Sequence, residues 1–127
     1  MDETNPQSKG KKIIIVEDEE ALSNALRLKL TSVGYDVTVA ANGQEGVDLG
    51  AASNYDLMLL DLILPVMDGF SVLAQLKEKG AKYPIIILSN LSQPEDIEKA
   101  KGLGASDFLV KSDIQLSKVL EYIKKFI

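Results

Sequence analysis

The sequence predicts an α/β domain of the (βα)5 type, in which helices wind doubly around a parallel five-stranded sheet. Short apolar runs alternate along the chain with stretches in which apolar residues recur at helical spacing. Three of the five runs are continuously apolar, as expected of parallel strands that are covered by helices on both faces. Polar residues stand where most of the runs end, and this pattern points to a site at one edge of the sheet.

The predicted strands are residues 12–16, 36–40, 56–61, 84–88 and 107–110. The second run, DVTVA, alternates more than the others and is typical of an edge strand. Five alternating units imply right-handed crossovers. The common strand order 2-1-3-4-5 places the second strand at the edge and makes the other four contiguous.

Helices are predicted between and after these strands. Asn42 with Glu45, Ser92 with Glu95, and Ser112 with Gln115 have the spacing of a capping box, and Pro94 falls in a first turn. Gly46 and Gly50 make the second helix the weakest, since glycine costs about 1 kcal/mol relative to alanine within a helix. The apolar positions at helical spacing are Leu22, Leu26, Leu30 and Val33, then Phe70, Leu73 and Leu76, then Leu116, Val119, Leu120 and Ile123.

Composition limits the function classes. The 127 residues fit one domain, and we interpret 1–10 as a flexible polar tail and 11–127 as the folded domain. There is no cysteine and no histidine, so thiolate or imidazole metal ligands and Ser-His relays are excluded. A net charge of −5 argues against direct nucleic-acid binding. No apolar run reaches the roughly 18 residues of a membrane span. These features suit a cytoplasmic protein.

Four of the predicted strands carry polar residues at their carboxyl ends. Glu17 and Asp18 follow the first strand, Asp61 ends the third, and Ser89 and Lys111 follow the fourth and fifth. Ligands of such sheets bind beyond the carboxyl ends of the strands, where the strand order switches. Each residue alone has an ordinary explanation, such as a helix cap, a loop residue or a solvated strand end. Together, at the same end of adjacent strands, they predict a single pocket.

Three carboxylates in one pocket need compensating positive charge. Lys111 supplies one charge, and the remaining excess favours a hard divalent cation, Mg²⁺ or also Mn²⁺, with all-oxygen ligands. Such an ion recruits phosphate oxygens, so the pocket is suited to a phosphoryl group. Asp61 at its centre can act as the attacking nucleophile and form an aspartyl phosphate.

These motifs resemble the receiver domain of bacterial two-component response regulators, a flavodoxin-like fold also found in chemotaxis regulators. The resemblance covers about residues 11–127. The segments that carry it are IIIVEDE, DLMLLDLILPVMDG, PIIILSN and GASDFLVK, together with the spacing from Asp61 to Pro65 and Gly69.

The resemblance implies a role for each residue of the site. Asp61 would be the phosphorylation site, Lys111 would pair with the phosphoryl group, and Ser89 would move toward it and bond to it. Phe108 would be an aromatic switch that turns inward as Ser89 shifts. Mg²⁺ would be held by Glu17, Asp18, Asp61 and the backbone carbonyl of Ile63, with Glu17 acting through water.

The resemblance also implies partners. The phosphoryl donor would be a sensor histidine kinase, a phosphotransfer protein or a small acyl phosphate. Output would pass through the surface of the fourth helix, fifth strand and fifth helix to an effector protein or a fused output domain. The domain would be no enzyme toward external substrates and would catalyse only its own phosphorylation and dephosphorylation. Homodimerisation stays open, because Asp107 resembles a residue of one dimeric subfamily whose basic partner in the last helix is missing here.

Two residues depart from the family pattern. Asn90 stands after the switch hydroxyl, where alanine or glycine is usual, and Ser112 follows Lys111 in place of proline. A cis bond costs about 0.5–1 kcal/mol before proline but about 2.5–4 kcal/mol before other residues. We therefore predict a trans Lys111–Ser112 bond, a new partner for the Ser112 N–H, and a Ser112 hydroxyl that caps the fifth helix.

Three other classes of protein fit the sequence less well. A phosphatase of the haloacid dehalogenase type would need a second aspartate where Ile63 stands. A flavodoxin-like FMN protein would need a phosphate loop rich in hydroxyls and glycine where VEDEEA stands. A pseudo-receiver, a scaffold without phosphorylation, conflicts with the complete set of Asp61, Ser89 and Lys111. Whether the chain is a stand-alone regulator or part of a longer one is left open.

Overall fold

The computed structural model describes residues 9–127, so most of the predicted N-terminal tail lies outside the described residues. Five parallel strands form one sheet in the order β2-β1-β3-β4-β5, as predicted. The strands are β1 (Lys12–Val16), β2 (Asp36–Ala40), β3 (Leu57–Leu60), β4 (Ile85–Ser89) and β5 (Asp107–Val110). They alternate with α1 (Glu20–Ser32), α2 (Gly43–Ala52), α3 (Gly69–Glu78), α4 (Pro94–Gly102) and α5 (Leu116–Phe126).

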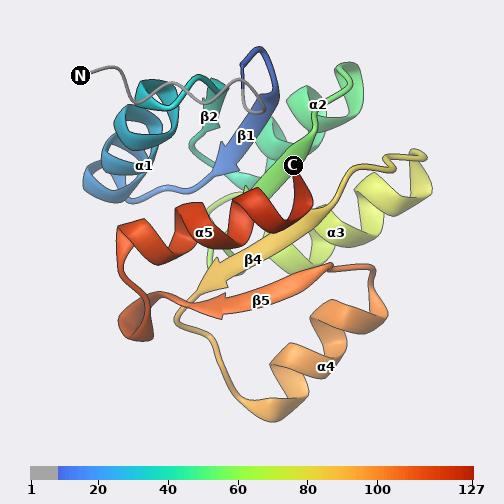
Figure 1. Ribbon diagram of the computed structural model, residues 1–127. Helices are drawn as coiled ribbons and strands as arrows, with labels where there is room; N and C mark the ends of the chain where they lie inside the picture. The colour runs from blue at the N-terminus through green and yellow to red at the C-terminus, as the bar shows by residue number, and fades with distance from the viewer. Residues whose placement is uncertain (1–8) are drawn as a thin grey trace.

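The helices cover both faces of the sheet and give two hydrophobic cores (Figure 1). On one face, Leu26 and Leu30 of α1 and Ile123 of α5 pack against alternate residues of the central strands. On the other face, Val47 of α2 and Leu73 of α3 pack against the residues between them. The central strands are buried on both sides, which explains why their sequences are continuously apolar rather than alternating.

The helix starts agree with the predicted caps only in part. Asn42 Oδ1 accepts the Glu45 N–H at 2.9 Å, so the capping of α2 is confirmed. At α4 the prediction was one residue early: Gln93 precedes Pro94, and its N–H donates to Asp96 Oδ2 at 3.2 Å. At α5 the prediction was wrong, because a short 3-10 helix over Lys111–Asp113 delays the α-helix to Leu116.

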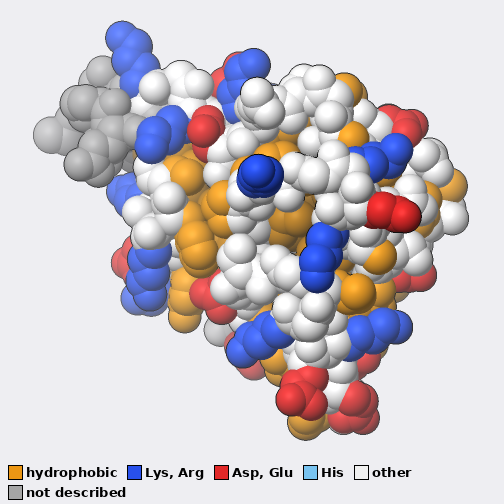
Figure 2. All heavy atoms as spheres, turned by 90° about the vertical axis from the view of Figure 1, so that its right-hand side faces the viewer, with side chains coloured by type: hydrophobic (Ala, Val, Ile, Leu, Met, Phe, Trp, Pro, Cys, Tyr) orange, Lys and Arg blue, Asp and Glu red, His pale blue; other side chains and the backbone are white. Residues whose placement is uncertain are grey.

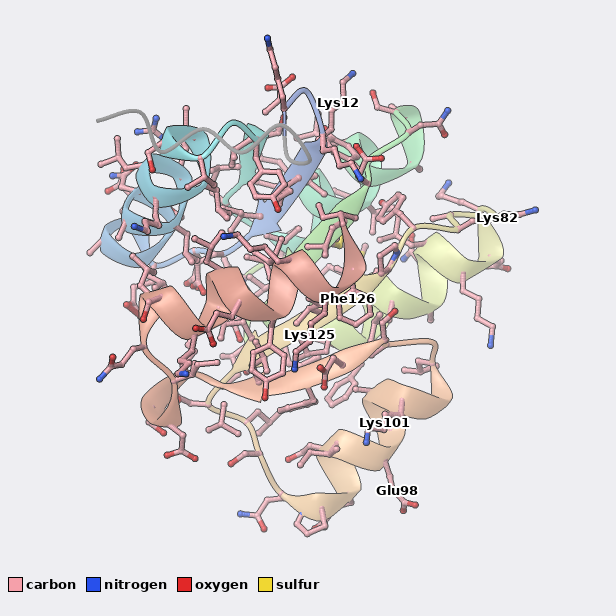
Figure 3. All side chains as sticks on the ribbon, in the orientation of Figure 1. Lys12, Lys82, Glu98, Lys101, Lys125 and Phe126 are labelled. Carbon is pink, nitrogen blue, oxygen red and sulfur yellow. The ribbon has the colours of Figure 1, made fainter. Side chains whose placement is uncertain are left out.

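The two ends of the sheet carry different side chains. Figure 2 views the end where the strands begin, and lysine side chains surround an apolar hollow there. This hollow has a volume of about 480 Å³ and is lined by Leu73, Lys77, Lys82 and Phe126 among others. Lys82 comes from the α3–β4 connection and Phe126 from the end of α5 (Figure 3). The predicted site lies at the opposite end, where the strands finish.

Within the described residues, no helix is long and apolar enough to cross a lipid bilayer.

Candidate functional site

The strand register brings the predicted site residues to one edge of the sheet. Val16 is paired with Leu60, so Glu17 and Asp61 follow on neighbouring strands. Ser89 is paired with Val110, and Lys111 comes next in the chain. The backbone holds the carboxylates in place, because Glu17 N–H donates to Ala40 O at 3.0 Å and Asp61 N–H to Val16 O at 3.1 Å.

Lys111 lies between two of the carboxylates. Its Nζ is 2.7 Å from Glu17 Oε1 and 2.8 Å from Asp61 Oδ2. Glu17 and Asp61 are only 3% and 5% exposed, so their charges are removed from water and need such a partner. Lys111 thus supplies one positive charge to the pocket, as expected, and its contact with Glu17 as well as Asp61 was not predicted.

Backbone N–H groups bind the remaining carboxylate oxygens. Ile63 N–H donates to Asp61 Oδ1 at 3.2 Å, and Glu19 N–H donates to Glu17 Oε2 at 3.0 Å. Burial raises the pKa of Glu17 above its ordinary value, and the Asp61 charge adds to this effect against the hydrogen bonds from Lys111 and Glu19. Burial acts to lower the pKa of Lys111, but its bonds to Asp61 and Glu17 outweigh it and the pKa is raised. Lys111 therefore stays cationic.

Asp18 completes a cluster of three carboxylates. One oxygen each of Glu17, Asp18 and Asp61 lies within 4.8 Å of the others. Asp18 is exposed, and among residues 9–127 its carboxylate has no hydrogen bond or ion pair. One ammonium group thus faces three carboxylates, and a donor set made only of oxygens fits Mg²⁺. The residues present therefore fit the divalent ion predicted from the sequence.

The other predicted residues lie around this centre. Ser89 is fully buried, and its Oγ accepts the Leu91 N–H at 3.3 Å. Ile63 is 58% exposed, and it contacts Asp61 through its N–H. Phe108 is half-buried and stands opposite Ile87 in the β4–β5 ladder. The Phe108 side chain packs against the same hydrophobic core as Ile87.

Gly69 contributed to the sequence-based resemblance only through its spacing from Asp61, and what this glycine does was not predicted. Its N–H donates to Leu62 O at 2.9 Å, and a Cβ on Gly69 would collide with the backbone carbonyl of Asp61. Any larger residue would displace the segment that carries Asp61. The signal available was the Asp68-Gly69 dipeptide ahead of a helical pattern, which indicates a tight helix start but not what the glycine touches.

Fold and site together define a doubly wound domain that gathers carboxylates, a hydroxyl and a lysine at the switch point of its sheet. The model of the response regulator receiver domain family matches residues 13–124. The chain belongs to this family, whose members act in phosphorylation-dependent two-component signalling and bind Mg²⁺ at an acidic site.

Known proteins similar to the chain include a cell cycle response regulator CtrA of Brucella ovis, 39% identical over 100 residues. This match covers 79% of the chain and 43% of the relative, so the chain spans less than half the length of that protein. The receiver domain of sensor histidine kinase PA1611 from Pseudomonas aeruginosa, with magnesium coordinated in its active-site cleft, has a TM-score of 0.83 at 28% identity, covering 92% and 97% of the two chains.

A response regulator protein from Burkholderia pseudomallei, with a phosphorylated aspartic acid, calcium ion and citrate, has a TM-score of 0.79 at 25% identity. The match covers 87% of this chain and 64% of that one.

Proposed function

We propose that Asp61 is the phosphoryl acceptor of a signalling switch. The observation that carries this proposal is a carboxylate that is 5% exposed, lies 2.8 Å from the Lys111 ammonium, and shares its pocket with Glu17 and Asp18. A buried carboxylate is costly, and this one stands at the edge of the sheet where ligands of doubly wound folds bind. The phosphorylated aspartate of the Burkholderia pseudomallei neighbour supports the same chemistry.

The proposed reaction transfers one phosphoryl group to Asp61. A carboxylate oxygen of Asp61 attacks phosphorus, the bond from phosphorus to the donor breaks, and its electron pair leaves with the donor. The donor is the phosphohistidine of a sensor histidine kinase or phosphotransfer protein, with imidazole leaving, or an acyl phosphate, with carboxylate leaving. Attack of water on the phosphorus of the aspartyl phosphate then releases inorganic phosphate and restores Asp61. The chain turns over only its own phosphoryl group.

Each residue of the pocket has a proposed part in this transfer. Lys111 Nζ already touches Asp61 Oδ2, so it is within reach of oxygens on a phosphoryl group attached there. Ser89 Oγ releases the Leu91 N–H and turns to a phosphoryl oxygen. Mg²⁺, held by Glu17, Asp18, Asp61 and the carbonyl of Ile63, would neutralise charge on the phosphoryl oxygens when bound.

The output is proposed to leave through α4, β5 and α5. Phe108 and Tyr122, with Ile114, line a hollow on this surface, and this set offers apolar contacts to an effector protein or a fused output domain. Inward movement of Phe108 would change the shape of this surface after Ser89 shifts. Homodimerisation through it stays a prediction.

Labelling with acetyl phosphate and Mg²⁺ tests the acceptor. The protein should gain one phosphoryl group, which hydroxylamine removes, and chelation should abolish the gain because the donor's charge then meets an unshielded acidic pocket. Asp61→Asn should take up none. Asp56→Asn is the matched control, because Asp56 precedes the same strand at its opposite end and binds Lys12 N–H at 2.7 Å. Labelling retained in Asp61→Asn would refute the assignment.

A further inference from the structure

The loops that follow β4 and β5 are joined by one hydrogen bond. Asn90 Oδ1 accepts the backbone N–H of Ser112 at 2.9 Å. The ladder between the two strands ends one step earlier, with Ser89 opposite Val110. The Asn90 side chain thus continues the connection between the strands beyond the point where their backbones pair. It is the partner that the Ser112 N–H was predicted to need.

This bond lies next to the two groups that are proposed to contact the phosphoryl group. Asn90 directly follows Ser89, and Ser112 directly follows Lys111. Both Asn90 and Ser112 are exposed, so the bond contributes nothing to either hydrophobic core. Its structural effect is to fix the turn over Lys111–Asp113 against the start of the β4–α4 loop.

The turn over Lys111–Asp113 sets the direction in which the Lys111 side chain leaves the backbone. Its Nζ must span from β5 across β4 to reach Asp61 on β3, and its side chain is 13% exposed at the contact. A long, flexible side chain reaches a fixed point more often when the backbone that carries it is held. The Lys111–Ser112 bond is trans, as predicted, so a cis bond does not supply this hold.

We propose that Asn90 is a positioning residue for phosphoryl transfer, one that acts by holding the N–H of Ser112 and thereby the direction of Lys111. The proposal rests on the function proposed above. Asn90 touches neither Asp61 nor the carboxylates that would hold Mg²⁺ among the described contacts. Its loss therefore slows transfer while leaving the affinity for Mg²⁺ unchanged.

Amide hydrogen exchange tests the bond without any phosphorylation. The N–H of residue 112 should be protected in the unmodified protein and should lose that protection in Asn90→Ala. Asn90→Asp retains an acceptor oxygen and should restore it. Ser112→Ala keeps the N–H and removes only the hydroxyl, so residue 112 should stay protected. Unchanged protection in Asn90→Ala would overturn the proposal.

The rate of labelling by acetyl phosphate at saturating Mg²⁺ tests the positioning role. Asn90→Ala should be slower by roughly two- to tenfold, the range that one neutral hydrogen bond supplies. Replacing the Lys111–Ser112 amide by an ester, which has no N–H, should slow labelling similarly. The double variant, Asn90→Ala with this ester, should be no slower than the slower single variant, because each removes the same bond.

Two results would overturn the positioning role. If the two single effects multiply in the double variant, Asn90 does not act through Ser112. If Asn90→Ala weakens Mg²⁺ binding, measured by calorimetry, in proportion to the rate, it disturbs the carboxylates instead. Failure of the unmodified protein to accept a phosphoryl group would count against the proposed function, and hydrogen exchange at residue 112 would still decide whether Asn90 holds the turn.

Discussion

Asp61 shows how a charged residue is tolerated among leucines. It ends a strand whose residues Leu57–Leu60 are buried, and its own side chain is 5% exposed. An isolated carboxylate there would be strongly destabilising. The Lys111 ammonium donates a hydrogen bond to Asp61 Oδ2, and the Ile63 N–H donates one to Asp61 Oδ1. The charge is thus compensated by a backbone group close in the sequence and by a lysine far away in the sequence.

Tyr83 is a half-buried residue with a polar hydroxyl, and its environment predicts a dependence of stability on pH. Its hydroxyl donates to Gly50 O at 2.8 Å, and burial, with a contribution from Tyr55, raises its pKa from 10.0 to about 12. As pH rises from 10 toward 12, the unfolded chain loses this proton while the folded protein keeps it. Unfolding then releases a proton, so stability falls as pH rises through this window.

We therefore expect Tyr83→Phe to lose less stability between pH 10 and pH 12 than the unmodified protein does, since phenylalanine does not titrate. At neutral pH the same variant should be less stable by about 0.5–1.5 kcal/mol, the usual net contribution of one hydrogen bond. Urea denaturation at both ends of the window measures the two effects. An identical decline with pH in both proteins would show that Tyr83 does not titrate as described.

At the scale of elements, α2 illustrates why three glycines occur in one helix. A Cβ on Gly43 would collide with the backbone carbonyl of Met67, and one on Gly46 would lie 2.8 Å from Val16 Cγ1. On Gly50 it would lie 2.8 Å from the Tyr83 hydroxyl. Helix propensity alone indicates a weak helix. The short distances to neighbouring atoms show a further role, because the glycines let α2 approach β1, Tyr83 and the loop that follows Asp61.

Two glycine substitutions separate propensity from packing. Gly43→Ala should destabilise the protein by about 1–3 kcal/mol, as overpacking against backbone does. It should also slow labelling of Asp61, because the Met67 loop must shift. Gly102→Ala is the control: no atom beyond its chain neighbours and the adjacent backbone of α4 lies within 4 Å of the added Cβ, so helix propensity should stabilise the protein by up to about 1 kcal/mol. Chemical denaturation measures both, and a stabilising Gly43→Ala would contradict the packing described here.

At the scale of the whole molecule, the proposed switch couples the pocket to a distant surface. Ser89 is fully buried in β4, and Ile87, two residues earlier in the same strand, stands opposite Phe108 of β5. A phosphoryl group can shift a conformational equilibrium only through contacts that differ between the two states. Ser89 Oγ, which binds the Leu91 N–H in this state, is the group proposed to change partner.

A beryllofluoride adduct of Asp61 tests this coupling. It should shift the amide resonances around Ser89 and Phe108 and along α4. Ser89→Ala should still form the adduct but lose most of the shifts at Phe108 and α4, whereas Ser53→Ala, an exposed serine after α2, should behave as the unmodified protein. Shifts in Ser89→Ala that match the unmodified protein would remove Ser89 from the coupling.

The sequence by itself determined the layers, the strand order and the edge at which the site lies. Period and length of the apolar runs distinguish buried parallel strands from helices, and β1, β2 and β5 have the predicted bounds. The clustering of Glu17, Asp18 and Asp61 followed from the same pattern, because carboxyl ends of parallel strands meet at one edge. The trans bond after Lys111 followed from local chemistry.

Tertiary structure decided the details that depend on residues far apart in the chain. Ser112 has capping-box spacing to Gln115, but its N–H is taken by Asn90, 22 residues away, and the chain makes a 3-10 turn before α5 begins at Leu116. Lys111 contacts Glu17 as well as Asp61 because the register of β1, β3, β4 and β5 places both carboxylates within its reach. Local sequence determines which backbone conformations have a low free energy. The hydrogen-bond partner of each polar group is fixed only when the strands have paired.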